Sequence, residues 1–258
     1  MAVLAQRRFF VVPAGAQTWR AAELGQEKNA TLSSGHSLLD AHLPGNGWPV
    51  GGLIEVLQER AEQHVWQLLL PALAQAIGKQ AGPAVLVNAP FEPFGPSLAA
   101  QGLPGERLLC IKAEKPAARL WATEQSLRCA DVVAVLAWLP RAKSAELRRL
   151  HMAAQQHDKL LFVMRELNAA LDASPARLRL RVEGAEAMRV HILKRRGPPL
   201  ETPLELPAYP ARLAALLQAR KARASATPVA APTPAVAAVS PLPPRRRSHV
   251  LDRTVALP

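Results

Sequence analysis

Residues 51–70, GGLIEVLQERAEQHVWQLLL, have the layout of a phosphate-binding loop: a glycine turn, a short apolar strand, a polar loop and an amphipathic helix. A working loop reads G-x-x-x-x-G-K-[ST]. Its glycines let backbone N–H groups approach phosphate, its lysine neutralises charge and its hydroxyl binds Mg²⁺. The corresponding positions here are Gln58, Gln63, His64 and Val65. The sequence keeps the layout but lacks the side chains that bind phosphate.

Two further features oppose nucleotide binding. Glu59 and Glu62 add negative charge to the loop, where a polyphosphate would lie. Nucleotide hydrolases of this layout also place an acidic residue at the carboxyl end of a later strand to reach Mg²⁺. That strand reads VVAVLAWL here, with Leu136 at the expected position and Asp131 at the opposite end. We therefore predict no catalytic residue, no metal, no cofactor and no ATPase activity.

The elements around this loop alternate between strands and helices. Apolar runs predict buried strands, whereas apolar residues on one helical face predict amphipathic helices. Strands that are apolar on both faces favour a parallel sheet covered by helices, an α/β fold. Pro71 lies within the first long helix and predicts a kink or an early end. The predicted strands are 53–57, 84–90, 107–113, 131–140 and 159–165, and the main helices are 63–77, 116–129 and 144–158.

The pattern then changes to period-two alternation in residues 176–184 and 187–197, which predicts an antiparallel β-hairpin. One face of this hairpin carries arginines and the other carries Leu178, Leu180 and Val182. A basic cluster predicts contact with an acidic protein surface or with DNA phosphates, and a solvated strand face is the alternative. The cluster contains Arg177, Arg179, Arg181, Lys194, Arg195 and Arg196.

The chain divides by composition into four segments. Residues 1–30 include a possible helix, 31–206 form the α/β core with hairpin 176–196, and 207–223 form a short helix. Residues 224–258 are rich in Pro and Ala and lack a helical or strand period, which predicts a disordered tail. Arg245, Arg246 and Arg247 follow a proline-rich spacer in this tail. They are interpreted either as a short docking motif or as a solubilising basic run.

Composition limits the class of protein. The net charge is +12, which favours acidic partners or nucleic acid, and 49% hydrophobic residues are enough for a packed core. The two cysteines, Cys110 and Cys129, lack metal-ligand spacing and are predicted to be buried and reduced. The N-terminal apolar run FFVV is too short for a signal peptide, and no run approaches the roughly 18 apolar residues of a membrane span. We expect a cytoplasmic protein with no membrane partner.

With these motifs in place, the segment SSGHSLLDAHLPGNGWPVGGLIEVL resembles the approach to the phosphate loop of RecA recombinases, with Gly52, Ile54 and Glu55 at matching positions. The likeness covers roughly residues 31–206. Within the RecA-like and SulA-related proteins, the chain looks most like the ImuA family. The motifs that carry this likeness are WPVGGLIEVL, LLLPALAQA, AVLVNAP, LWATEQSLRC and VHILKRRGPPL.

The resemblance implies a fold and a function. It implies a RecA-like core with a degenerate phosphate loop, acting as a non-enzymatic adaptor in SOS-induced, error-prone translesion DNA synthesis. The implied partners are an ImuB-like Y-family polymerase homologue, an error-prone C-family polymerase and RecA itself. Three alternatives stay open: a SulA-type cell division inhibitor that binds FtsZ, an ATP-dependent RecA-like recombinase paralogue, and a DNA-binding module.

Overall fold

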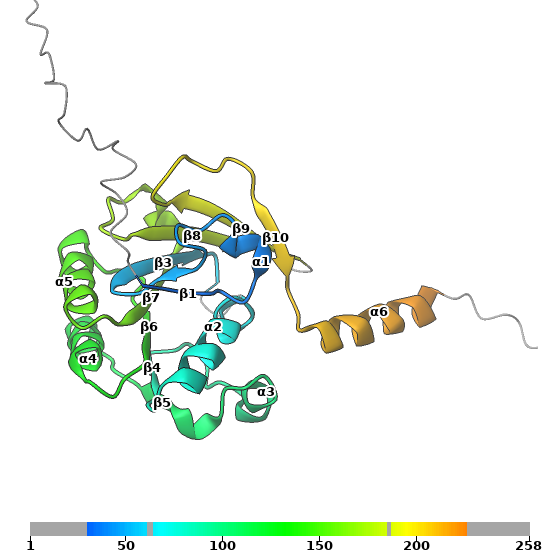
Figure 1. The fold of residues 1–258 in the computed structure, drawn as a ribbon, viewed down its shortest axis with the longest axis horizontal. Coiled ribbons are helices and arrows are strands. Elements are labelled where there is room, and N and C mark those ends of the chain that lie inside the picture. Colours follow the sequence, from blue (N-terminus) through cyan, green and yellow to red (C-terminus); the bar gives the residue numbers. More distant parts are fainter. Residues whose placement is uncertain (1–29, 61–63, 185–186, 226–258) are drawn as a thin grey trace, which may run out of the picture. The chain divides into compact units, whose positions relative to one another are not determined.

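The structure, a computed structural model, describes residues 30–60, 64–184 and 187–225 (Figure 1). From β3 to β7 strands alternate with helices, and β8, β9 and β10 then follow one another. The strands are β1 (Thr31–Leu32), β2 (Trp48–Pro49), β3 (Gly52–Gln58), β4 (Ala84–Val87), β5 (Leu108–Ile111), β6 (Ala134–Trp138), β7 (Leu160–Glu166), β8 (Leu178–Glu183), β9 (Ala187–Lys194) and β10 (Leu204–Pro207). The α-helices are α1 (Ser37–Asp40), α2 (Val65–Lys79), α3 (Gly95–Ala99), α4 (Pro116–Arg128), α5 (Ser144–Gln156) and α6 (Ala211–Ser225). The 3₁₀ helices are η1 (Gly105–Arg107) and η2 (Leu167–Leu171).

A single eight-stranded sheet organises the fold, with the strand order β10-β9-β8-β3-β7-β6-β4-β5. The six strands from β8 to β5 run parallel, and β9 and β10 are antiparallel to their neighbours. The predictions of an α/β fold, a mainly parallel sheet and an antiparallel hairpin are confirmed. The hairpin β8–β9 joins the sheet edge to edge, with β8 next to β3.

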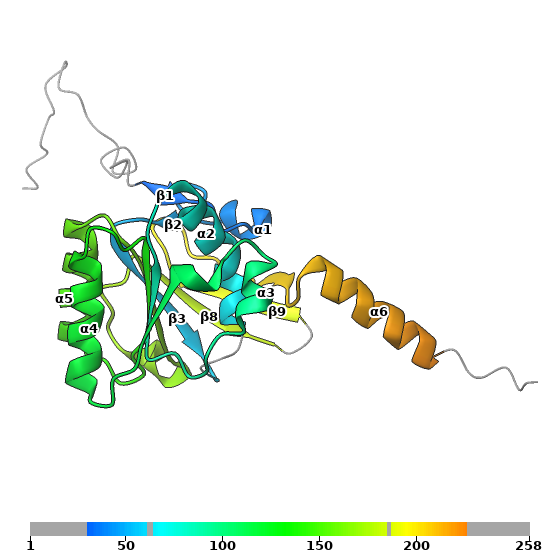
Figure 2. The ribbon, with the colours of Figure 1, turned by 90° about the horizontal axis from the view of Figure 1, so that it is seen from below.

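Helices cover the sheet on both faces (Figure 2). Helices α4 and α5 lie side by side on one face, where they bury a core with β3, β4, β6 and β7. Helix α2 lies on the other face, and its core extends to the inner side of the β8–β9 hairpin and β10. Because β3 lies between these layers, all seven of its residues are buried, including Glu55 and Gln58. An apolar run without alternation is the expected sequence of such a strand.

Pro71 lies within α2, but the helix continues to Lys79. The expected early end was wrong. A proline has no N–H to donate to the carbonyl four residues earlier, which here belongs to Gln67. His36 supplies the missing donor, because its Nε2 lies 3.1 Å from the Gln67 carbonyl oxygen. The segment before α1 thus compensates for the proline.

Three features did not follow from the sequence patterns. The two-stranded sheet β1–β2 and the edge strand β10 were not predicted, because two-residue and four-residue strands leave little periodicity. Cys110 and Cys129 are exposed rather than buried. The possible helix within residues 1–30 and the predicted tail lie outside the described residues.

Helix α6 falls largely in a second unit, Ala214–Pro258. It lies in the segment where the sequence predicts a helix. Leu213 and Leu216 are exposed on it, as are the basic residues Arg220, Lys221 and Arg223. Within ranges 30–60, 64–184 and 187–225, no helix combines the length and apolar character needed to cross a bilayer.

Candidate functional site

The connection between β3 and α2 carries His64, and not a lysine, at the position that binds phosphate in a working loop. Gln58 closes β3 with 2% of its surface exposed, and Val65 begins α2 fully inside the core. His64 has a left-handed backbone with φ of 57°, and its Nε2 donates to the carbonyl oxygen of Gly184 at 2.6 Å. The side chain at the lysine position therefore connects α2 to the hairpin β8–β9. Gln63 lies outside the described residues.

The expected metal position is likewise part of the core. Leu136 on β6 is fully buried, in register with Leu86 on β4 and Phe162 on β7. No cluster of three or more His, Cys, Asp or Glu side chains within the described part of the chain could hold a metal ion. Leu136 thus contributes to packing at the point where a metal-binding enzyme needs a carboxylate.

Two adjoining cavities occupy the carboxyl ends of the parallel strands. The first encloses about 190 Å³, and the second, of about 230 Å³, shares Pro90 and Trp138 with it. The first is lined by Gln58, Glu59, Asn88, Pro90, Arg119, Trp138, Pro140, Met164, Arg165 and Glu166. The second is lined by Val65, Trp66, Ala89, Pro90, Phe91, Glu92, Pro93, Phe94 and Trp138. In open parallel sheets, this edge is where ligands bind.

The second cavity carries exposed aromatic side chains. Phe91 and Phe94, in the loop between β4 and α3, are 65% and 71% exposed. Full burial of a phenylalanine stabilises a protein by about 1.5–3 kcal/mol. Because both side chains are largely exposed, Phe91 and Phe94 each lack most of this stabilisation. Trp66 from α2 is half-buried beside them. Clustered exposed aromatics mark surfaces that bind other molecules. We call Trp66, Phe91 and Phe94, together with the buried Trp138 that lines both cavities, the aromatic surface.

The charges at this edge do not favour a phosphate ligand. Arg119 donates from Nε and Nη2 to the carbonyl oxygens of Ala113 and Glu114, at 2.8 and 3.0 Å. Lys112 donates to the carbonyl oxygen of Ala89 at 2.6 Å. Both cations therefore stabilise the backbone of neighbouring loops. Exposed carboxylates on the cavity walls belong to Glu59, Glu92 and Glu166.

The basic hairpin cluster is not a single surface. Arg179 is buried, and its Nε donates to Oε2 of Glu55 at 2.6 Å. Arg165 on β7 donates to the other carboxylate oxygen of Glu55 at 2.8 Å. The prediction that Arg179 is exposed for a partner is wrong, because its cation neutralises a carboxylate that is buried in the centre of the sheet.

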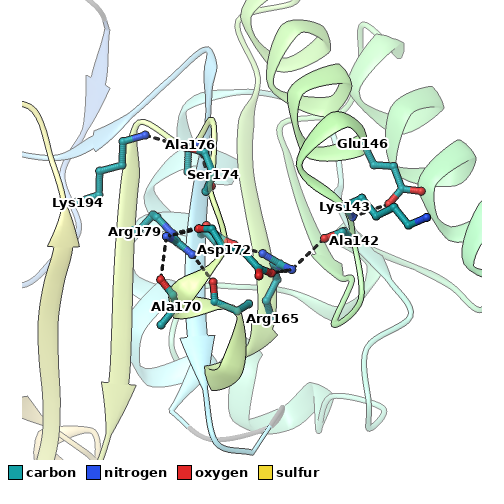
Figure 3. A network of polar contacts seen from close by, with 12 residues as sticks. Ala142, Lys143, Glu146, Arg165, Ala170, Asp172, Ser174, Ala176, Arg179 and Lys194 are labelled. Carbon is teal, nitrogen blue, oxygen red and sulfur yellow. Dashed lines mark hydrogen bonds and ion pairs between the residues drawn. The ribbon is translucent and has the colours of Figure 1, made fainter.

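The two arginines also hold the polypeptide that follows β7 (Figure 3). Arg179 donates to the carbonyl oxygens of Ala169 and Asp172 at 2.6 and 3.1 Å. Arg165 donates to the carbonyl oxygen of Ala142 at 2.9 Å and to the Asp172 carboxylate at 3.0 Å. These bonds use both terminal nitrogens of each guanidinium group, although the buried Nε of Arg165 has no hydrogen-bond partner, and they fix η2 against the sheet.

The outer face of the hairpin has balanced charges. Arg181 forms an ion pair with Glu183, and His191 lies 3.0 Å from the same carboxylate. Glu183 pairs across the strands with Arg189, and Arg189 pairs with Glu205 on β10. These alternating signs indicate a solvated strand face for Arg181, the alternative that the sequence left open.

The other predicted basic residues are spread along the loops. Lys194 donates to the carbonyl oxygen of Ser174 at 2.8 Å, and Arg195 donates to those of His42 and Pro198. Arg196 is exposed and Arg177 is half-buried, each without an ion pair within the described ranges. Arg245, Arg246 and Arg247 lie outside the described residues.

Sequence reasoning missed the aromatic surface and the buried Glu55. Phe91 and Phe94 fall between the predicted strands 84–90 and 107–113, and two phenylalanines three residues apart among prolines were a visible signal. Glu55 was noted only as part of a resemblance. A carboxylate in a strand that is otherwise apolar indicates a buried ion pair, because an unpaired buried charge is too costly to retain.

Comparison with known proteins finds one matching family and several relatives. Residues 51–160 match the sequence model of the family described as "Cell division inhibitor SulA". A relative of that name from Edwardsiella piscicida is 30% identical over 126 residues, which cover 49% of this chain and 75% of the relative. Another, from Yersinia enterocolitica, is 33% identical over 118 residues, covering 45% of this chain and 70% of the relative. A third, from Pectobacterium atrosepticum, is 30% identical over 124 residues, covering 48% and 74%.

These matches correct the functional prediction. The relatives are inhibitors of cell division by name, so the prediction of an adaptor for translesion synthesis with ImuB-like, C-family polymerase and RecA partners is contradicted. The more specific likeness to the ImuA family is not supported, whereas the broader likeness to RecA- and SulA-related proteins is. This chain is at least 30% identical to these relatives and covers at least 70% of the length of each. It therefore belongs to the SulA family.

Proposed function

We propose that this protein inhibits cell division by binding FtsZ, the alternative partner that the sequence had left open, and that it does so without catalysis. The observation that carries the proposal is the aromatic surface at the carboxyl edge of the sheet. Phe91, Phe94, Trp66 and Trp138 all lie within residues 51–160, the segment that matches the SulA family. As in that family, we expect the protein to act during the SOS response.

A protein partner suits this surface better than a nucleotide does. The cavity walls combine aromatic rings and prolines with few polar groups, and the nearby cations already bind backbone carbonyls. Aromatic side chains are enriched at the centres of protein interfaces, where a few of them supply most of the binding free energy. Phe91 and Phe94 provide two such side chains on one loop.

The fold is consistent with a RecA-like core that has lost its nucleotide site. Strand β3 lies in the middle of a parallel sheet and leads through a polar loop into α2, as in phosphate-binding folds. His64 bonds to Gly184, and Leu136 packs in the core. We infer that the scaffold is retained for the shape of its carboxyl edge.

The basic residues that keep an available charge suggest a second, weaker contact. Arg177 and Arg196 are without ion pairs in the described residues, and they suit an acidic patch on the same protein partner. Such a contact would raise the association rate at low salt and weaken at high salt. DNA binding that falls steeply with salt would instead assign these residues to phosphate.

The direct test measures the assembly of purified FtsZ with GTP, by sedimentation, in the presence of the full chain. We expect the wild-type protein to reduce the pelleted fraction. The double substitution Phe91→Ala with Phe94→Ala should weaken binding by at least tenfold, since each hot-spot residue contributes more than about 1–2 kcal/mol. Leu171→Ala is the matched control, because Leu171 is 96% exposed elsewhere on the molecule.

Three results would count against the proposal. If the wild-type chain leaves FtsZ assembly unchanged, the proposed function is wrong. If the double variant inhibits FtsZ assembly as strongly as wild type does, the aromatic surface is not the site that binds FtsZ. A measurable affinity for ATP, titrated in the presence of Mg²⁺, would restore the recombinase alternative.

A further inference from the structure

Prolines restrain the loop that carries the two exposed phenylalanines of the aromatic surface. Residues 90–96 read Pro-Phe-Glu-Pro-Phe-Gly-Pro, so each phenylalanine directly follows a proline. A proline ring fixes its own φ at about −65°, which limits the conformations of this loop. The Nζ of Lys112 donates to the carbonyl oxygen of Ala89 at 2.6 Å and anchors the start of the loop. Phe91 and Phe94 are therefore held in place before a partner binds, and less conformational entropy is lost on binding.

Two hydrogen-bond donors on the cavity walls are available to a ligand. Asn88 lines the first cavity and Trp66 lines the second, and both residues are half-buried. Within the described residues, neither the side-chain amide of Asn88 nor the indole N–H of Trp66 forms a hydrogen bond. Free donors beside apolar rings suit a ligand that offers carbonyl oxygens.

Exposed carboxylates surround the same cavities. Glu59 and Glu166 line the first cavity, and Glu92 lines the second. None of the three forms an ion pair among the described residues, whereas Arg165 is paired with carboxylates and Arg119 binds backbone carbonyls. The charge that remains available to a ligand is negative, so the surface is complementary to a cation beside an apolar segment.

We propose that this surface binds a proline-rich segment of the protein partner, in the polyproline II conformation and with arginine or lysine beside the prolines. The inference rests on the proposed function and names the part of the partner that the aromatic surface binds. Proline-rich segments dock in aromatic-lined grooves because their helix is formed before binding. Their carbonyl groups make no internal hydrogen bonds, so they can accept from Trp66 and Asn88.

The two adjoining cavities fit the repeat of such a segment. A polyproline II helix has three residues per turn and advances about 9 Å per turn, so successive turns present the same face to the surface. Prolines would occupy the aromatic second cavity, and the basic residue would reach Glu59 and Glu166 at the first. Single-stranded nucleic acid also stacks on aromatic rings, but its phosphates would meet these carboxylates.

The first test titrates the full chain into a fluorescein-labelled synthetic peptide, Pro-Pro-Leu-Pro-Pro-Arg-Arg, and measures fluorescence anisotropy. We expect saturable binding by wild type. Phe94→Ala should weaken binding by at least tenfold, as expected for an aromatic hot spot, and the control Leu171→Ala should not. Glu59→Gln should weaken it by about two- to fivefold through the loss of an exposed ion pair, and Glu205→Gln on β10 should not. Circular dichroism confirms that each variant is folded.

Two altered peptides test the chemistry of the ligand. A peptide with its prolines replaced by alanine and its arginines kept should bind at least tenfold more weakly. A peptide with its arginines replaced by glutamine should bind more weakly than the original, and its affinity should depend less on salt. If the alanine peptide binds as tightly as the original, charge alone attracts the peptide and the proposal is wrong.

The chain has a similar segment of its own, PLPPRRR, at residues 241–247. A variant with Pro241→Ala, Pro243→Ala and Pro244→Ala should bind the labelled peptide as wild type does. If this variant binds it at least tenfold more tightly, the surface takes the chain's own segment and the assignment to a partner is wrong. If neither protein binds the peptide, the proposal is overturned. Because the titration contains no FtsZ, a failure here is distinct from a failure of the FtsZ assembly test.

Discussion

The imidazole of His36 donates a hydrogen bond from Nε2 to the carbonyl oxygen of Gln67, at 3.1 Å, across 31 residues of chain. This carbonyl is the one that Pro71 leaves without an intrahelical donor. The close fit between the two segments extends to Gly35, whose φ is +80° and where an added Cβ would lie 2.3 Å from Cβ of Pro71. A residue with a side chain could not occupy that position without moving α2.

The substitution His36→Ala should destabilise the protein by about 1–3 kcal/mol, because it leaves the partly buried carbonyl of Gln67 unsatisfied. In a Pro71→Ala background, residue 71 donates to Gln67 itself, and the same substitution should cost clearly less. Urea unfolding of the four proteins in this cycle measures the coupling. An equal loss in both backgrounds would show that His36 acts through packing rather than through this hydrogen bond.

The substitution Glu55→Gln should destabilise the fold by about 3–5 kcal/mol, because it leaves the cation of Arg179 buried without a counter-charge and leaves Arg165 with the Asp172 carboxylate alone. Glu166→Gln is the matched control, since Glu166 is exposed at the end of β7 and should change stability little. Chemical unfolding followed by circular dichroism measures both. A loss at Glu55 no larger than the loss at Glu166 would contradict this account of the buried network.

We expect the stability of the protein to depend on pH through His151. Its Nδ1 accepts the N–H of Leu53 at 3.1 Å, and burial, followed by the charges of Arg177 and Lys194, lowers its pKa. Below the unfolded pKa of about 6.5, the unfolded chain binds a proton that the native imidazole does not. Stability should therefore be full above about pH 6.5 and should fall as pH drops toward the lower native pKa.

The variant His151→Asn keeps an acceptor near Leu53 but does not titrate. We expect its free energy of unfolding to change less between pH 7 and pH 5 than that of wild type, with Met152→Ala as an exposed neighbour for comparison. Identical slopes for His151→Asn and wild type would exclude His151 as the source of the pH dependence.

Glu124 connects α4 to α5, and it should affect stability at a lower pH than His151 does. The hydrogen bond from Arg149 is the largest influence that lowers the pKa of this carboxyl, and Arg128 also lowers it. Stability from this pair should be present above the ordinary pKa of about 4.3 and should be lost as pH falls through the lower native value. In the Glu124→Gln variant, the free energy of unfolding should change less with pH below pH 4.5 than it does in wild type. An unchanged pH dependence in this range would contradict the prediction.

The phosphate-loop comparison shows how far sequence reasoning reached at the candidate site. Gln58, His64, Val65 and Leu136 were identified as residues that cannot bind phosphate or Mg²⁺, because their side-chain types alone decide that chemistry. The sequence did not show that His64 bonds to Gly184, a contact across 120 residues. Nor did it show that Phe91 and Phe94 join Trp66 and Trp138, since periodicity carries no information about which loops meet at a sheet edge.

Arg179 and Arg181 illustrate the same limit within one strand. Both follow the period-two pattern that places them on one face of β8, and the sequence alone made them equivalent. The structure separates them because β8 lies beside β3 and η2 covers Arg179, whereas Arg181 lies beyond that cover next to Glu183. Exposure depends on the neighbouring segments, and these are distant in the chain.

The sequence by itself determined the class of fold and the loss of nucleotide chemistry. Apolar runs that alternate with amphipathic segments can bury their surface only as a parallel sheet between helices, and missing functional groups cannot be supplied by folding. Tertiary structure alone decided that Glu55 is paired, that α2 continues through Pro71 and that the aromatic side chains gather at one edge. Each of these depends on contacts between residues far apart in the chain, which form only when the sheet assembles and excludes water.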